Sequence, residues 1–223
     1  MKNILFLFLV ATVSTTSVAD EKKGYFEFGI GKSSVDVSTK TYSGSAGGVT
    51  YTNAKADFDY KDPTTYGFEI GMSNFLSTPL RIGFAVATLD LELEKATGTG
   101  TIATGSGTVT LSGSATAADF RGIGVSFDND VKIYMVNGYY DFASEGKIRP
   151  FIGAGVGLAD VQNAKDREFT LGLHAGINYD LGNNMYVGGR FSNYQINGIT
   201  DKLGVQYEDT SVNYYGITIG VRF

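Results

Sequence analysis

Apolar and polar residues alternate along much of the chain, and the alternation is clearest in residues 169–181. One set of alternate positions is apolar: Phe169, Leu171, Leu173, Ala175, Ile177, Tyr179 and Leu181. The other set is small or polar: Thr170, Gly172, His174, Gly176, Asn178 and Asp180. A strand points successive side chains to opposite faces, whereas a helix would scatter these residues around its axis. The segment therefore predicts a β-strand with one apolar face.

Seven further segments show the same period, which gives about eight predicted strands. They are residues 25–32, 65–73, 80–93, 131–142, 150–159, 185–192 and 211–223. Within residues 80–93 the alternation slips near Thr88, which a β-bulge or the edge of a bilayer would explain. The predicted connections are short at 74–78, 144–147 and 181–184, and longer at 33–64, 95–130, 160–168 and 196–210. Short turns on one side and longer loops on the other are typical of outer-membrane barrels.

The polar set of positions indicates which way the sheet faces. It carries glycine and ionisable residues, which are Glu27, Glu69, Arg81, Asp141, His174, Asp180, Arg190 and Arg222. A sheet with these residues on one face and an apolar opposite face suits a barrel whose outside contacts lipid, and a sheet in hydrocarbon must close. The predicted fold is therefore all-β, an eight-stranded antiparallel transmembrane β-barrel with periplasmic turns and longer extracellular loops. We expect the inward ionisable residues to pair as a structural network, although a narrow polar pore is the alternative.

The first residues predict a secretory signal peptide over residues 1–19. Lys2 precedes the apolar run 4–10, and small residues at Ser17 and Ala19 suit cleavage after Ala19. The barrel domain is then residues 20–223. The absence of cysteine excludes disulfides and thiolate metal sites, and a net charge of −5 argues against nucleic-acid binding.

Two neighbouring stretches resemble a family motif: Asn137–Phe142, which reads NGYYDF, and Arg149–Gly157, which reads RPFIGAGVG. They are similar to the opacity-protein and surface-antigen family of outer-membrane β-barrels, which shares the barrel of the OmpA membrane domain; Phe151 stands where that family usually has Tyr. The resemblance implies a place in the outer membrane of a Gram-negative bacterium. The partners it implies are outer-membrane lipid and lipopolysaccharide, the barrel assembly machinery, and a host or environmental ligand at the loops. The last strand resembles the signal read by that machinery, through Tyr215, Ile217, Ile219, Val221 and Phe223.

The leading functional hypothesis is a non-enzymatic surface protein with a structural or adhesin-like role. A small porin for ions or small solutes is the alternative. A lipid-modifying enzyme is the third hypothesis, because a His beside a Ser can serve as a base in ester hydrolysis. A lipid A deacylase of that kind uses His-x-Ser on one strand, but here Gly176 follows His174 at that position. We expect no catalytic residue, cofactor or metal site, and the acids of residues 56–62 are interpreted as solvated loop residues.

Residues 96–117 form a low-complexity segment of Gly, Thr, Ser and Ala. Alternation in residues 108–112 and 120–126 indicates strands that extend past the membrane or an extra hairpin within residues 106–127. A flexible extension and a sticky or antigenic surface are both compatible with this composition.

Overall fold

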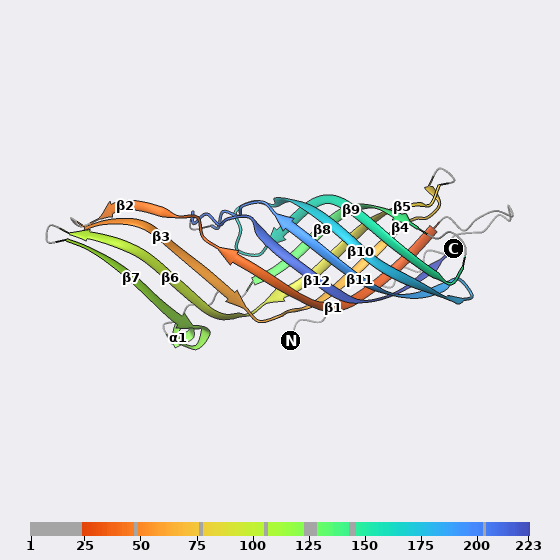
Figure 1. Cartoon of the computed structure of the whole chain (residues 1–223), viewed down its shortest axis with the longest axis horizontal. Coiled ribbons are helices and arrows are strands. Elements are labelled where there is room, and N and C mark those ends of the chain that lie inside the picture. Colours follow the sequence, from red (N-terminus) through yellow and green to blue (C-terminus); the bar gives the residue numbers. More distant parts are fainter. Residues whose placement is uncertain are drawn as a thin grey trace.

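The computed structural model describes residues 24–46, 49–75, 78–104, 107–122, 129–142, 146–202 and 204–223. Eight antiparallel strands form a closed barrel: β1 (Gly24–Ser38), β4 (Thr64–Met72), β5 (Leu80–Leu91), β8 (Asn129–Asp141), β9 (Ile148–Val161), β10 (Glu168–Gly182), β11 (Met185–Ile196) and β12 (Thr210–Arg222). The ring closes where β1 pairs with β12, from Tyr25 opposite Arg222 to Asp36 opposite Ser211 (Figure 1). The predicted fold class and all eight predicted strands are confirmed, while the predicted signal peptide, residues 1–19, lies outside the described residues. None of the helices among the described residues is long and apolar enough to span a membrane.

Four more strands extend the same sheet beyond one end of the barrel, and we call this part of it the outer sheet. They are β2 (Tyr42–Ala46), β3 (Val49–Tyr60), β6 (Leu93–Thr104) and β7 (Gly107–Thr116), paired in the order β2-β3-β6-β7. The prediction that residues 33–64 form a connection without strands is therefore wrong. Residues 95–130 contain strands too, in keeping with the alternative that strands extend past the membrane. β3 leads into β4, and β6 follows β5 after one residue, so the pairing of β4 with β5 brings β3 and β6 together. Thr, Val and Tyr then favour an extended sheet over a loop.

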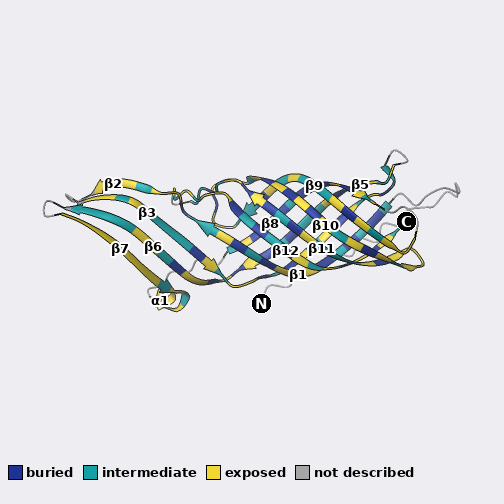
Figure 2. Cartoon of the chain, viewed as in Figure 1, coloured by how far each residue is buried: buried dark blue, intermediate teal, exposed yellow. Residues whose placement is uncertain are grey.

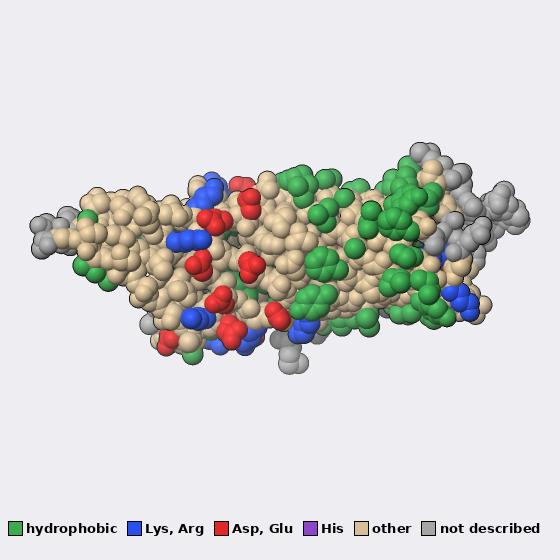
Figure 3. All heavy atoms as spheres, in the orientation of Figure 1, with side chains coloured by type: hydrophobic (Ala, Val, Ile, Leu, Met, Phe, Trp, Pro, Cys, Tyr) green, Lys and Arg blue, Asp and Glu red, His purple; other side chains and the backbone are tan. Residues whose placement is uncertain are grey.

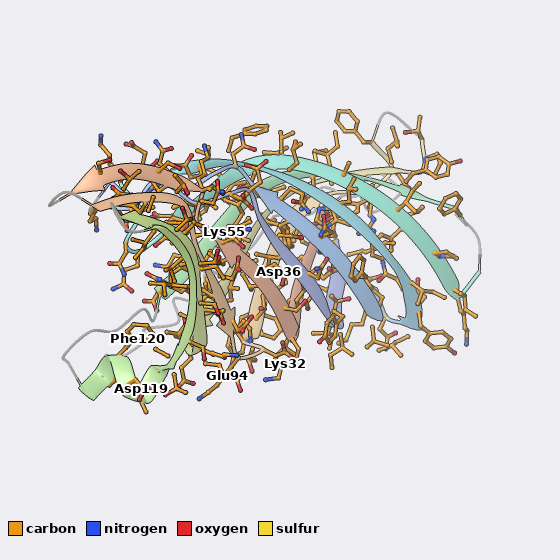
Figure 4. All side chains as sticks on the ribbon, turned by 60° about the vertical axis from the view of Figure 1, so that its left-hand side comes forward. Lys32, Asp36, Lys55, Glu94, Asp119 and Phe120 are labelled. Carbon is orange, nitrogen blue, oxygen red and sulfur yellow. The ribbon has the colours of Figure 1, made fainter. Side chains whose placement is uncertain are left out.

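Of the extra hairpin considered within residues 106–127, only the first arm is a strand among the described residues, and its partner is β6. Residues 108–112 lie in β7, which pairs with β6 along its whole length. Phe120, however, lies in the short helix α1 (Ala117–Gly122) and not in a strand, and residues 123–128 lie outside the described residues. The Asp119 carboxylate accepts hydrogen bonds from the backbone N–H and the hydroxyl of Thr116, which lower the pKa of Asp119 and favour a helical turn here. Figure 4 shows α1, with Asp119 and Phe120, at the end of β7 in the outer sheet.

The outside of the barrel carries an apolar band. Large outward side chains on all eight barrel strands are well exposed, among them Phe68 at 42%, Ile177 at 48% and Ile217 at 64%. Figure 2 shows the alternation of exposed and buried positions along the barrel strands, and Figure 3 shows apolar side chains over the barrel and a belt of charged ones between them and the outer sheet. The predicted assignment of apolar residues to the outside is confirmed. Because short turns join the strands at the other end, that end is periplasmic and the outer sheet is extracellular.

The inside of the barrel consists of two layers along its axis. The layer near the short turns holds the buried charged residues, among them Glu27, Glu69, Arg81 and Arg190. The layer near the outer sheet is apolar, and its buried core includes Val35, Leu89, Leu91, Val131, Ile133, Ile196 and Val212. Of the two explanations offered for the slip near Thr88, the β-bulge is wrong, since β5 pairs with β4 and β8 in unbroken register across that position. The strand keeps its phase, and it is the apolar residues that move from outward to inward positions. Beyond Thr88 the inward positions hold Leu89 and Leu91, whose side chains are buried in the lumen.

Candidate functional site inside the barrel

Glu69 of β4 is the centre of the polar layer. Its carboxylate accepts hydrogen bonds from the hydroxyl of Tyr25, from the hydroxyl of Tyr139 at 2.6 Å and from the amide of Asn137 at 3.2 Å. The guanidinium of Arg190 lies 3.3 Å from the same carboxylate. Glu69 is only 2% exposed, so these donors replace the water that an ionised carboxylate would otherwise need.

Arg190 of β11 links Glu69 to a second buried acid. Its Nη2 lies 2.6 Å from Oε1 of Glu27, whose other oxygen accepts a hydrogen bond from the Tyr186 hydroxyl at 2.9 Å. Glu27 on β1 and Glu69 on β4 are directly opposite each other in the strand register. Two carboxylates at this spacing repel unless a cation lies between them, and Arg190 supplies that cation.

Arg81 of β5 forms the next group, near the short-turn end. Its Nε lies 2.9 Å from Oδ2 of Asp141. The guanidinium carbon also lies 4.7 Å from the ring centroid of Tyr139, 5.0 Å from that of Phe151 and 5.4 Å from that of Tyr25. These aromatic faces surround the cation and fill the lumen beside it.

Asp180 of β10 lies nearest the short turns and forms ion pairs with two arginines. Arg222 lies 3.0 Å from its Oδ2, and Arg149 lies 3.4 Å from the same atom. The alternation within residues 25–32 and 185–192 places Tyr25 and Tyr186 on the inward face, but neither is among the predicted site residues. Sequence reasoning missed Arg149, Phe151 and Tyr139, although the strand alternation places each of them on the inward side.

His174 has a serine neighbour that sequence reasoning missed. Its Nδ1 lies 2.9 Å from the hydroxyl of Ser192, and its Nε2 lies 3.2 Å from the side-chain oxygen of Asn137. Ser192 lies opposite His174 on β11, so a search along one strand could not find it. His174 is 4% exposed and Ser192 is 0% exposed, so the pair is enclosed among lumen side chains rather than facing lipid.

The described residues enclose two spaces of note inside the barrel. One, of about 30 Å³, lies between Glu27, Glu69, Arg190 and the tyrosines Tyr194 and Tyr214, and it has room for very few water molecules. The other, of about 430 Å³, lies in the apolar layer near the outer sheet. The polar layer is thus nearly filled, while the apolar layer is partly hollow.

The apolar band, the filled polar lumen and the closed ring of eight strands define a small outer-membrane β-barrel protein. Residues 7–223 match the family described as "Surface antigen", and the chain belongs to that family. This finding confirms the family resemblance and the place in the outer membrane of a Gram-negative bacterium.

Comparisons with individual proteins agree with this family. The chain is 42% identical over 59 residues to outer membrane protein PagN of Salmonella typhimurium, a match that covers 26% of this chain and 23% of PagN. The solved structure of Neisserial surface protein A is similar with a TM-score of 0.53 at 13% identity, over 90% of this chain and 97% of that one. Outer membrane protein AlkL gives 0.52 at 14% identity, over 94% of each chain. At these identities the two structures support the fold alone.

Proposed function

We propose that this protein is a non-enzymatic surface protein that binds a host or environmental ligand through its outer sheet. The observation that carries the proposal is the outer sheet itself, which stands beyond the membrane band as an ordered structure (Figure 1). It is fixed to the barrel by pairing of β3 with Asp36–Ser38 of β1 and by an apolar cluster of Phe58, Leu93 and Ala96. A rigid surface loses little conformational entropy when it binds a partner.

The edge of the outer sheet is suited to recognition. Among the described residues, β7 pairs only with β6, and its ten residues are almost all exposed. No charged residue occurs between Lys95 and Asp119, and Val109 and Leu111 are 56% and 51% exposed. Proteins usually protect such an edge with charges, because an unprotected edge pairs with other chains. We infer that β7 contributes to ligand binding.

We expect two lysines on β7, Val109→Lys with Leu111→Lys, to reduce adhesion. The measurement is attachment to cultured epithelial cells of a non-adherent Gram-negative host that displays the protein. Adhesion should fall by about fivefold or more, since central contacts of an interface often contribute over 1 kcal/mol each. The matched control, Asn197→Lys with Asp166→Asn, adds the same charge at exposed positions away from the outer sheet. Equal adhesion of the β7 variant and the unaltered protein would place recognition elsewhere.

The channel hypothesis makes a contrasting prediction. Because the Arg81, Arg190 and Glu69 groups and their aromatic neighbours nearly fill the polar layer, we expect no discrete conductance in a planar bilayer. A large porin recorded in the same bilayer serves as the control for insertion and detection. Reproducible single-channel steps from the folded protein would favour the porin alternative.

The enzyme hypothesis finds a pair of suitable groups in His174 and Ser192. Both side chains are buried, and neither lines the space of about 30 Å³ in the polar layer, which is itself too small for a lipid ester. We therefore infer a structural role for this pair and for the ion-pair network, and no catalytic role. The residues Tyr215, Ile217, Ile219, Val221 and Phe223 all point outward, and their recognition by the barrel assembly machinery remains a prediction.

A further inference from the structure

The apolar layer inside the extracellular half of the barrel is unusual for its position. Leu89 and Leu91 of β5, Val131 of β8, Ile196 of β11 and Val212 of β12 all point into the lumen. These walls surround a space of about 430 Å³. A lumen that only had to face water would be more stable with polar side chains there, because apolar surface in contact with water is unfavourable.

The size of this space suits a small organic molecule. Binding pockets for such molecules measure about 300–1,000 Å³, and an apolar cavity of about 150 Å³ already accepts benzene. The side chains of Ile133, Met135, Tyr194 and Tyr214 belong to the same buried cluster as the walls and also border the small space beside the ion-pair network, so they lie between the two spaces. A ligand would therefore enter from the extracellular end and stop there.

Polar residues gather at the extracellular rim of the space, in contrast to its walls. Asn129, Asn163 and Lys202 line it there. The Lys202 ammonium donates a hydrogen bond to the backbone carbonyl of Gln162 at 2.9 Å, a neutral acceptor. The amide of Asn163 donates to the side-chain oxygen of Asn129 at 2.6 Å, which holds the two amides together at the rim.

The other ionisable groups that line the space are Asp201, Tyr60 and Tyr207. The Asp201 carboxylate accepts a hydrogen bond from the backbone N–H of Val205 at 2.8 Å, within its own turn. Burial raises the pKa of Tyr207 to about 12, so its hydroxyl stays neutral at physiological pH. Lys202 is thus the cationic group among the residues that line the space.

We propose that this space is a binding site for a single-chain amphiphile with an anionic headgroup, such as a medium-chain fatty acid. The hydrocarbon chain lies between Leu89, Leu91 and Val131, and the carboxylate lies near Lys202 and the two rim amides. Such a molecule could come from the extracellular medium or from the surrounding lipid. The proposal concerns the barrel interior and does not depend on recognition by β7.

The test uses the full chain in nanodiscs of deuterated phosphatidylcholine, with labelled Ile, Leu and Val methyl groups and decanoate as the probe. We expect saturable nuclear Overhauser contacts from decanoate to the methyls of Leu89, Leu91 and Val131. Contacts only to the outward methyls of Ile177 and Ile217 would show partition into lipid and would overturn the proposal. Adding decanoate from solution, or only as a trace component of the nanodisc lipid, distinguishes the two sources.

Two variants sharpen this test. Ala164, which lines the space and is 8% exposed, can be replaced by Phe. Ala164→Phe should weaken decanoate binding by about tenfold or more, because the added ring occupies the ligand volume. Unchanged affinity in a folded Ala164→Phe protein would contradict the site.

Lys202→Gln tests the headgroup without altering the walls, since Lys202 is exposed. It should weaken decanoate by about two- to fivefold, the range for an exposed ion pair, and leave decanol unchanged. If decanoate and decanol bind the unaltered protein equally, and Lys202→Gln changes neither, the anionic part of the proposal is wrong. This variant remains informative if Ala164→Phe does not fold.

Discussion

Replacing Glu69 with Ala should destabilise the barrel by about 3–5 kcal/mol, the usual cost of removing one partner from a buried ion pair. The substitution leaves Arg190 with Glu27 alone and removes the acceptor of the Tyr25 and Tyr139 hydroxyls. Those donors lie where water has little room, so their lost hydrogen bonds are not replaced. The measurement is the temperature at which half of the protein in detergent micelles loses its folded, faster mobility on a gel.

Two comparisons make the Glu69 result specific. Glu94→Ala removes the same charge from an exposed position on β6 and should leave the midpoint nearly unchanged. Replacing the whole group, with Glu27→Gln, Glu69→Gln and Arg190→Met together, should recover much of the loss, because buried ion pairs are often replaceable by neutral residues. A Glu69→Ala midpoint equal to that of Glu94→Ala would refute the view that Glu69 organises the polar layer.

The strand pattern of the sequence predicted most of the barrel. Alternation of apolar and polar residues located all eight strands and assigned Glu27, Glu69 and Arg190 to the inside. It could not predict that Arg190 bridges the two acids. That contact depends on strand register, on the tilt of the strands and on the curvature of the ring. These set the distances between Arg190 on β11 and the two acids on β1 and β4, which are not neighbouring strands.

The sequence pattern was less informative near the extracellular end. There, Leu89 and Leu91 lie on the same inward face of β5 as Arg81. Because both are apolar, the sequence pattern suggested that they point outward. The expectation that the lumen is polar throughout caused this error. Most of the outer sheet was missed for another reason, although extended strands were considered for residues 108–112. Thr, Ser and Gly suit both a loop and a solvated strand, and only the pairing of β3 with β6 decides between them.

The close packing of the lumen makes a second large effect testable on one strand. Gly71 and Gly67 both lie on β4 and both face inward. A Cβ on Gly71 would lie 2.2 Å from the backbone oxygen of Ile82 and 2.7 Å from Cα of Gly83, whereas a Cβ on Gly67 meets nothing within 4 Å. Neither backbone atom can move aside by a change of rotamer, so strand β5 would have to shift away from β4.

We therefore expect substitutions by Ala at these two glycines to have opposite effects. Gly71→Ala should destabilise the barrel by about 1–3 kcal/mol or more, through overpacking against backbone. Gly67→Ala should stabilise it by about 0.5–1 kcal/mol, because Ala loses less conformational entropy in a strand than Gly does. The thermal midpoint of the gel-mobility change measures both. Equal shifts at the two positions would mean that the strands do not approach each other at Gly71 as closely as the structure shows, and the tight closure of the polar layer would lose its support.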